Sequence, residues 1–488
     1  MSLKADVLRG LKWTAGAKFS GQLITWGITI VVMRLLAPAD YGLLAMASVL
    51  IVFMNMVAEV GLGPALVQAH EVDTRQLRQA FGIFLLVNWA LCLLLNLLAP
   101  AMAVFYDEPR LELVLRVLSV QFLFTPLAVV PEVLLQRQLE YKKRSLIDLS
   151  TAIFTSLATL LLALGHHGVW ALVLGNVGAT VWRTVLVNSI APFPHWPSFA
   201  VGGMRKLLSF GGKVTVSRFL WMFFTQIDVV IVGRVLGSEV LGMYSVAMHL
   251  ASMPVQRVSS ILNQVAFPAF ARHQHDRGLI AAQLLKVLRM LGFVAFPVLW
   301  GIASVAPELV AVLLGPGWSG AVMPLQVLAL VMPLRAIVGF LPSVTDAVGR
   351  PEVAMHNVLV GCAIMPLAFW LGTQWGMVGV AYAWLLAYPV VLLINTRRMV
   401  AVVGLTLAQV SRHVAPSMLC GAAMFGAVWA VQLALRAHPD RRVVLAVEVL
   451  VGAASYLLGA LALNRAALQE IGGAVFGKAG LPQQAHAE

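Results

Sequence analysis

The amino-acid sequence predicts an all-α polytopic membrane protein with about fourteen transmembrane helices, and three observations lead to that prediction. Of the 488 residues, 60% are hydrophobic and 11% are charged, and the mean hydropathy is +0.88. Soluble chains are about 45–50% apolar and about 25% charged, so this chain has too few charges to cover a water-facing surface. Its apolar residues also form long runs, each near the roughly 20 residues that a bilayer-spanning helix needs.

Proline, glycine and charged residues divide these runs into predicted spans. Six spans precede a break in the apolar pattern, six follow it, and two more lie toward the C-terminus. The predicted spans are 14–36, 43–66, 80–105, 113–135, 146–165, 168–190, 213–236, 240–264, 287–306, 321–345, 354–374, 377–400, 413–434 and 443–463. The connections 37–42 and 237–239 are so short that the helices on either side of each must be antiparallel neighbours.

The distribution of Lys and Arg predicts the orientation of the spans. With the N-terminus in the cytoplasm, 22 of the 34 basic residues fall in cytoplasmic segments, seven fall in outer segments and five fall inside spans. Because cytoplasmic loops carry the excess of Lys and Arg, both termini are predicted to be cytoplasmic. No basic segment interleaved with aromatic residues exists to bind a nucleic acid, so the net charge of +13 does not indicate a nucleic-acid partner.

An internal repeat is visible when the sequence is offset by 200 residues. The recurring positions are Lys18 and Arg218, Arg34 and Arg234, Gly42 and Gly242, and Ala47 and Ala247. Weaker matches follow at offsets near 208 and 210. An even number of helices separates the copies, so they have the same orientation and are related by a pseudo-twofold axis along the membrane normal. Transporters built in this way bind substrate between the halves and rock one half against the other.

The repeat and the Pro/Gly-rich stretch between its copies predict the domain organisation. The predicted parts are an N-terminal six-helix lobe over 1–190, an inter-lobe linker over 191–212, a C-terminal six-helix lobe over 213–400, an accessory two-helix hairpin over 401–464 and a cytoplasmic tail over 465–488. The hairpin is predicted to be accessory because its spans carry few polar residues. Glu448 is the exception, and it is expected to find a partner or to approach the outer interface near Arg441 and Arg442.

Polar stripes inside the predicted spans mark a candidate substrate path, because polar groups in hydrocarbon are costly and face a bundle interior or a wet cavity. The substrate-binding candidates are Lys18, Gln22, Arg218, His249, Gln256 and Arg335. Alternatives stay open for several of them. Such stripes also serve helix packing, and His249 also fits a packed, hydrogen-bonded group. Lys18 and Arg218 lie near enough to the cytoplasmic boundary to snorkel.

Carboxylates in the spans or at their edges are the candidates for ion coupling, since a buried carboxylate binds a proton more readily than an exposed one. They are Glu59, Glu132, Asp148 and Asp228. Glu59 is the first choice because it shares a narrow stripe with Asn55 and Ser48. Asp228 also fits a structural ion pair with Arg218 or Lys18.

Motifs for other chemistry do not occur in the sequence. There is no GxxxxGK[ST] loop for ATP, no HExxH or GxSxG motif, and no His/Cys/carboxylate cluster with metal-ligand spacing. The protein is therefore not expected to be an enzyme or to carry a metal or a cofactor. An ion gradient or the membrane potential is expected to drive its cycle.

Five short segments resemble a known family. They are Arg34–Ala45 (RLLAPADYGLLA), Gly61–Gln68 (GLGPALVQ), Gln136–Lys143 (QRQLEYKK), Phe267–Arg272 (FPAFAR) and Leu314–Trp318 (LGPGW). Their order and spacing resemble polysaccharide exporters of the multidrug/oligosaccharidyl-lipid/polysaccharide (MOP) superfamily, and are most similar to the branch of colanic-acid-type exporters. The resemblance covers nearly the whole chain, but the family has no universal catalytic motif to transfer.

The resemblance implies two six-helix lobes in a bacterial inner membrane. It also implies a flippase for undecaprenyl-diphosphate-linked oligosaccharide repeat units, in exopolysaccharide or lipopolysaccharide biosynthesis. The lipid-linked oligosaccharide and membrane lipids would be its partners, with a polysaccharide polymerase and chain-length machinery as further candidates. Cationic cavity residues are a family theme that Lys18 and Arg218 could supply. Two alternatives stay open: an ion-coupled small-molecule or multidrug antiporter of the same superfamily, and a membrane-embedded polysaccharide polymerase.

Overall fold

The computed structural model describes residues 21–22, 25–58, 66–67, 72–199, 205–272, 276–435 and 438–475. Over these ranges the secondary structure is helical and contains no strand, which confirms the predicted all-helical membrane fold. Eleven described segments are long and apolar enough to cross a membrane. Two of them, Phe219–Val255 and Glu352–Ala401, each cover two predicted spans. The total of about fourteen spans therefore stays a prediction.

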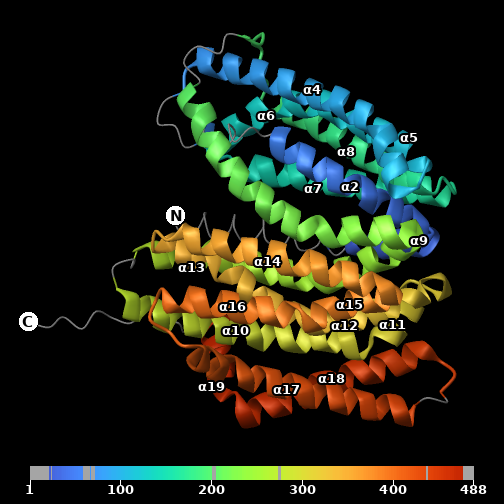
Figure 1. The fold of residues 1–488 in the computed structure, drawn as a ribbon, viewed down its shortest axis with the longest axis vertical. Helices are drawn as coiled ribbons and strands as arrows, with labels where there is room; N and C mark the ends of the chain where they lie inside the picture. The colour runs from blue at the N-terminus through green and yellow to red at the C-terminus, as the bar shows by residue number, and fades with distance from the viewer. Residues whose placement is uncertain are drawn as a thin grey trace, which may run out of the picture. The chain divides into compact units, whose positions relative to one another are not determined.

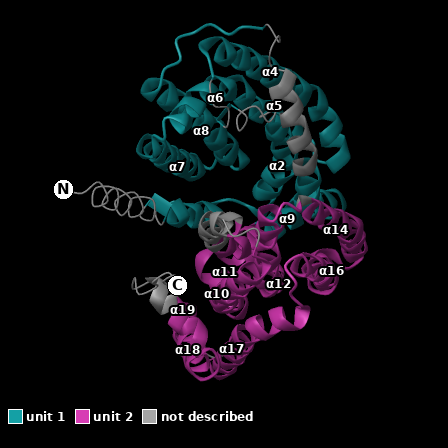
Figure 2. Cartoon of the chain, turned by 90° about the vertical axis from the view of Figure 1, so that its left-hand side faces the viewer, with its two compact units in different colours: residues 1–245 teal, residues 246–488 magenta. Residues whose placement is uncertain are grey.

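The chain separates into two compact units, Met1–Ser245 (unit 1) and Val246–Glu488 (unit 2) (Figure 2). This division falls inside one long helix and not in the predicted 191–212 linker. The reason is that the chain around Ser238 packs onto unit 1, as described below. The predicted lobes, linker, hairpin and tail remain predictions of domain organisation.

Unit 1 consists of long apolar helices and the first part of α9 (Figure 1). Its helices are α2 (Pro38–Ala58), α4 (Thr74–Tyr106), α5 (Arg110–Ser119), α6 (Gln121–Arg137), α7 (Tyr141–Leu164), α8 (Val169–Ile190) and α9 (Arg205–Arg272), which continues into unit 2. Local signals determine where some of them begin and end. Asp73 and Gln76 form a capping box at the start of α4, and Gly237, with φ of 83°, interrupts α9.

Unit 2 holds the rest of α9 and the helices that follow it. They are α10 (Arg277–Ser304), α11 (Ala306–Leu313), the 3-10 turn η1 (Pro316–Ala321), α12 (Val322–Phe340), α13 (Pro342–Ala347), α14 (Pro351–Gly372), η2 (Thr373–Trp375), α15 (Gly376–Leu386), α16 (Tyr388–Ala401), α17 (Leu407–Ala434), α18 (Arg441–Leu463) and α19 (Arg465–Val475). The α17–α18 pair lies along α10 (Figure 1). The Tyr456 hydroxyl donates to the Phe293 carbonyl at 2.9 Å and joins α18 to α10.

Repeat-related residues contact each other reciprocally within unit 1. A Cβ atom on Gly42 would collide with the backbone carbonyl of Ser238, and one on Gly242 would collide with that of Pro38. Pro38 and Ser238 are themselves separated by the repeat offset of 200 residues, as Gly42 and Gly242 are. Only glycine permits so close an approach of two backbones. The reciprocity is what a pseudo-twofold relation between the start of α2 and the region after Gly237 requires.

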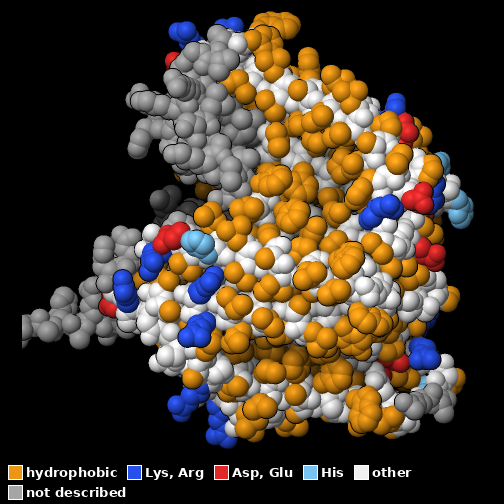
Figure 3. All heavy atoms as spheres, in the orientation of Figure 1, with side chains coloured by type: hydrophobic (Ala, Val, Ile, Leu, Met, Phe, Trp, Pro, Cys, Tyr) orange, Lys and Arg blue, Asp and Glu red, His pale blue; other side chains and the backbone are white. Residues whose placement is uncertain are grey.

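Many large apolar side chains point outward from the helices, as expected for surfaces in contact with lipid. Val104 is 80% exposed, Leu386 is 72% exposed and Leu450 is 69% exposed. Figure 3 shows hydrophobic side chains over most of the visible face, with charged side chains gathered toward the ends of helices. A water-soluble protein would not expose apolar surface on this scale.

Candidate functional site

Three charged side chains meet inside unit 1, one from each of three helices. Arg183 on α8 donates from Nε to Glu132 Oε1 on α6 at 2.6 Å, and from Nη1 to Asp148 Oδ1 on α7 at 2.8 Å. We call these three residues the Arg183 cluster. The structure thus joins two of the predicted coupling carboxylates through a single guanidinium group.

Proline chemistry helps to hold α8 against α6 beside the cluster. Pro131 has no N–H, so the Leu127 carbonyl four residues earlier lacks its helical donor. The Asn188 amide of α8 donates to that carbonyl at 3.0 Å. This contact satisfies a backbone group that would otherwise be orphaned in a span, and it positions Arg183 opposite Glu132.

Aromatic side chains fix the α7–α8 face next to the cluster. Trp182 donates from Nε1 to the Ser150 hydroxyl at 3.1 Å. Its ring stacks on Phe154 with the centroids 4.9 Å apart and an interplanar angle of 5°. These two contacts fix the position of α7 against α8. Asp148 and Arg183 are therefore carried by two helices that are held in place relative to each other.

The Arg183 cluster is partly open and its charges do not balance. The side chain of Arg183 is 33% exposed, as is that of Glu132, while that of Asp148 is 51% exposed. Charged groups within an apolar span are tolerated where they face a wet cavity or the bundle interior. Two carboxylates against one guanidinium leave a surplus negative charge. The arrangement is suited to attracting a small cation, and it is poorly suited to binding an anion.

A second cationic centre lies in unit 2 and has different partners. The Arg335 guanidinium of α12 lies over the Trp384 ring of α15, 4.7 Å from its centroid, and Nη1 approaches Met248 Sδ at 3.9 Å. Trp384 is 2% exposed and its ring contacts Phe369 and Tyr388. No carboxylate pairs with Arg335 among the residues that the structure describes. We call Arg335, Trp384 and Met248 the Arg335 centre.

The chemistry of the Arg335 centre favours an anion. A ring face attracts a cation but does not neutralise it. The charge of a half-buried guanidinium without a carboxylate can therefore act on a phosphate, which a guanidinium binds with charge-assisted hydrogen bonds. The prediction that Arg335 contacts substrate is compatible with this geometry and stays a prediction.

The other predicted residues have separate surroundings. Gln22 lies beside Thr25, whose hydroxyl donates to the Gln22 carbonyl at 2.9 Å, and His249 is exposed on α9. Asp228 is 4% exposed and accepts a hydrogen bond from the Tyr244 hydroxyl at 2.7 Å, on the other side of the Gly237 break. Lys18 and Glu59 lie outside the described residues, as do the side chains of Arg218 and Gln256. The predicted pairing of Asp228 with Lys18 or Arg218 therefore stays a prediction.

Sequence reasoning missed Arg183 and Trp384 as site residues. Arg183 lies well inside the predicted span 168–190, and an arginine there needs a partner. That signal points to Arg183 itself, but its partners lie 35 and 51 residues away on other helices. For Trp384 no comparable signal exists, because tryptophan is an ordinary residue of an apolar span.

Comparison with known proteins places this geometry in a family. The sequence model of the polysaccharide biosynthesis protein family matches residues 31–323. The teichuronic acid biosynthesis protein TuaB of Bacillus subtilis (strain 168) is 28% identical, with 93% of this chain and 95% of that protein covered. The lipopolysaccharide biosynthesis protein WzxC of Escherichia coli (strain K12) is 26% identical, with 81% of this chain and 80% of that protein covered.

Solved structures share the fold at low sequence identity. The lipid II flippase MurJ in an inward closed conformation superimposes with a TM-score of 0.76 at 12% identity, over 93% of this chain and 99% of that one. An inward-facing multidrug resistance MATE family transporter of the MOP superfamily gives a TM-score of 0.59 at 13% identity, over 77% and 95% of the two chains. The family match covers more than half of the 488 residues. The chain is therefore a multi-pass membrane protein that has the MOP transporter fold and belongs to the polysaccharide biosynthesis protein family.

Proposed function

We propose that this protein is a flippase for undecaprenyl-diphosphate-linked oligosaccharide repeat units in the synthesis of a bacterial exopolysaccharide or lipopolysaccharide. Its relatives are named for teichuronic acid and lipopolysaccharide biosynthesis, and it shares its fold with a lipid II flippase. The protein carries substrate across the membrane without changing its bonds, so it is a transporter and not an enzyme or a polymerase.

The single observation that carries the proposal is the Arg335 centre. A lipid diphosphate carries about two negative charges, and a cation in a low-dielectric site attracts such a group strongly. Arg335 is half-buried, and its neighbours in the described part of the chain are Trp384 and Met248 and not a carboxylate. Its guanidinium can therefore bind the diphosphate without first breaking an ion pair. The polyprenyl tail would remain in lipid.

The Arg183 cluster supplies the coupling step in this proposal. Binding of a small cation by the surplus negative charge would change the net charge around Arg183 and hence the packing of α6 and α7 against α8. An ion gradient or the membrane potential would bias the cycle through this change. In this proposal the protein lies in the inner membrane with both termini in the cytoplasm. It binds the substrate at the cytoplasmic face. A polysaccharide polymerase and chain-length machinery then act on the flipped product.

One observation favours the antiporter as a second candidate. The surplus negative charge of the Arg183 cluster would also attract a cationic drug or a metal cation. An antiporter of this kind would depend on Glu132 and Asp148 for substrate binding and would be insensitive to Arg335. The two candidates therefore make opposite predictions about the same residues.

A transport assay in reconstituted vesicles tests the proposal. The purified protein is reconstituted with a fluorescent polyprenyl-diphosphate oligosaccharide, and the lipid exposed on the outer leaflet is followed with a membrane-impermeant quencher. We expect Arg335→Ala to slow flipping strongly, Arg335→Lys to retain part of it, and Arg398→Ala, at an exposed arginine of the same unit, to leave it unchanged. Normal flipping by Arg335→Ala would overturn the role of Arg335. Cation efflux without lipid flipping would establish the antiporter.

A further inference from the structure

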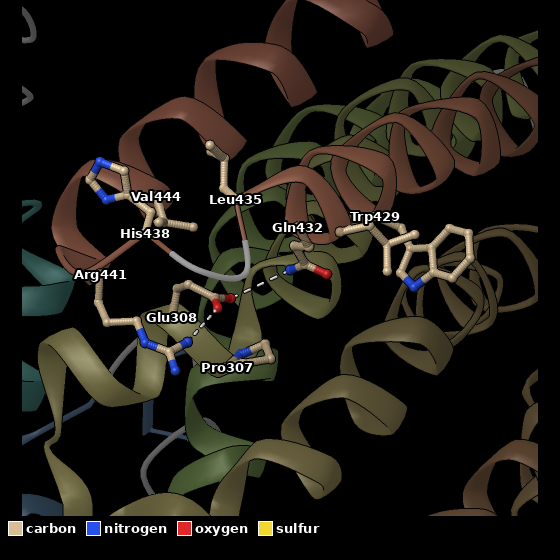
Figure 4. Close-up of a pocket in the computed structure, with 9 residues that line it drawn as sticks. Pro307, Glu308, Trp429, Gln432, Leu435, His438, Arg441 and Val444 are labelled. Carbon is tan, nitrogen blue, oxygen red and sulfur yellow. Dashed lines mark hydrogen bonds and ion pairs between the residues drawn. The ribbon is translucent and has the colours of Figure 1, made fainter.

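The α17–α18 hairpin and α11 enclose a pocket of about 250 Å³ close to the loop that joins α17 to α18 (Figure 4). Glu308, Gln432, His438 and Arg441 supply its polar groups. Arg441 donates from Nη1 to Glu308 Oε1 at 3.0 Å. The sequence pattern led us to expect that Glu448 finds a partner or approaches Arg441 and Arg442; Arg441 is close enough to act electrostatically on Glu448, but its guanidinium pairs with Glu308.

Glu448 lies one helical turn beyond Val444, which lines the pocket, and is completely buried. Neither of its carboxylate oxygens has a hydrogen-bond partner among the described residues. The Gln432 amide and the Glu308 carboxylate lie beside it. A buried, ionised carboxylate without a partner is far too costly to persist, so the group must acquire a positive charge or lose its own.

The hydrogen-bond donors and cations around Glu448 show which interactions this carboxylate lacks. Gln432 Nε2 has two hydrogens; it donates to the Ser304 carbonyl at 2.6 Å and lies 3.4 Å from Glu308 Oε2. Both hydrogens are thus directed at other acceptors, and the Gln432 amide lies near Glu448 without forming a hydrogen bond of good geometry with it. Among the described residues Arg441 is the one arginine or lysine beside the two carboxylates, and its side chain is 63% exposed while that of Glu308 is 8% exposed. Within the described part of the chain the pair therefore lacks one positive charge and one hydrogen-bond donor.

We propose that Glu448, buried beside the Glu308 carboxylate, holds one exchangeable proton, which it exchanges with water through the pocket. A carboxylate oxygen of Glu448 forms an O–H bond with a proton from a hydronium ion, and the reverse step returns the proton to water. No other bond changes. A metal ion fits less well, since no group of three or more His, Cys, Asp or Glu residues in the described chain is placed to hold one.

The groups that face this proton come from every helix packed on α18. Glu308 comes from α11 and Gln432 from α17, and α10 contributes the Ser304 carbonyl. Arg441 from α18 itself and His438 from the preceding loop lie at the mouth of the pocket. The charged residues of α19 lie at the other end of α18, where Glu470 pairs with Arg289 at 2.9 Å. Deprotonation of Glu448 would thus place a second negative charge beside Glu308 and loosen the hairpin from α10 and α11.

Infrared difference spectroscopy of the full-length protein tests the proposal. The spectrum of the wild-type protein minus that of Glu448→Gln should show, near neutral pH, the carbonyl band of one protonated carboxylic acid, which disappears as the pH rises. Glu470→Gln is the matched control, and its difference spectrum should show an ionised carboxylate. Ionised carboxylate bands for Glu448 near neutral pH would overturn the proposal.

Thermal unfolding in detergent supplies an independent readout. Because the neutral form of Glu448 is the one that packs, the wild-type protein should lose stability as the pH rises, and Glu448→Gln, a neutral group of the same shape, should not. Glu308→Gln removes the neighbouring negative charge, so Glu448 should release its proton at lower pH in that variant. If the wild type and Glu448→Gln lost stability equally as the pH rises, Glu448 would not hold the proton. If Glu448 released its proton at the same pH in Glu308→Gln as in the wild type, the Glu308 carboxylate would not act on it. Neither readout depends on lipid transport, so the proposed flippase function can fail separately.

Discussion

Two arginines inside the described spans of this protein, Arg183 and Arg335, have opposite surroundings. Arg183 in unit 1 binds two carboxylates through its guanidinium, and all three side chains are partly exposed. Arg335 in unit 2 has an aromatic ring and a thioether sulfur as its partners, and no carboxylate pairs with it in the described part of the chain. The same residue type therefore has its charge neutralised in one unit and left available in the other.

The difference shows that the charge of an arginine alone does not define an anion site in a transporter. A guanidinium already bound to two carboxylates must give up charge-assisted hydrogen bonds before it can bind a phosphate. A guanidinium that lies over an aromatic ring keeps N–H groups that can donate to a phosphate. In the proposed function the first arrangement serves coupling and the second binds a diphosphate, and the following changes are designed to break or sharpen this contrast.

The largest effect is expected from giving Arg335 a carboxylate. Met248→Glu would place a negative charge next to the guanidinium and make the Arg335 centre resemble the Arg183 cluster. A hydrogen bond to a charged group contributes about 1.5–3 kcal/mol, and about 1.4 kcal/mol corresponds to tenfold, so flipping in vesicles should fall by roughly ten- to a hundredfold. Met248→Gln has the same shape without the charge and should retain most of the flipping. Equal rates for the two variants would show that the free charge of Arg335 is not required.

A smaller effect, on stability, is expected when the Arg183 cluster loses its cation. Arg183→Met leaves two carboxylates in a span without a partner. Removing one partner of a fully buried pair costs about 3–5 kcal/mol, but these side chains are a third or more exposed, so we expect about 1–2 kcal/mol. Thermal unfolding in detergent measures it. Adding Glu132→Gln and Asp148→Asn should restore the stability, and a triple variant as unstable as Arg183→Met would mean that packing rather than charge was lost.

The contact that holds α8 on α6 should contribute less. Asn188→Ala removes the donor to the Leu127 carbonyl, at an expected cost of about 0.5–1.5 kcal/mol. Pro131→Ala restores a backbone N–H for the same carbonyl, so the Asn188 substitution should cost less in that background. A double-mutant cycle on unfolding temperatures measures this coupling. Strictly additive costs would argue against our account of the freed carbonyl.

The smallest effect is expected outside both centres, at Glu108 between α4 and α5. Hydrogen bonds from Arg110, and then from Ser238, hold the pKa of Glu108 below its usual value. The resulting stabilisation is present above the unfolded-state pKa and is lost as the pH falls through the folded-state pKa. Acidification should therefore lower the unfolding temperature of the wild type more than that of Glu108→Gln. The sign is opposite to that expected for Glu448, so a pH series distinguishes the two groups. Identical acid profiles for the wild type and Glu108→Gln would exclude this contribution.

Parts of the candidate site could be predicted from the sequence and parts could not. Glu132 and Asp148 stand out because a carboxylate inside an apolar run is costly wherever it lies. Their meeting on Arg183 could not be predicted, because it depends on how three helices rotate about their axes, and hydropathy does not determine that rotation. The burial of Glu448 shows the same limit. The sequence marks it as an exception in an apolar span, and only the packing of α17, α10 and α11 around it buries the side chain.

The sequence by itself determined the membrane fold, the helical spans and the repeat. In hydrocarbon every backbone polar group must be satisfied within its own segment, so a long apolar run has little choice but to form a helix. The repeat offset of 200 also identified Gly42 and Gly242 as equivalent before any contact between their helices was known. Only the tertiary structure decided that each glycine packs on a carbonyl of the other copy, and which charged groups are paired. These outcomes depend on side chains from segments far apart in the chain, and their energies exist only once the helices have packed.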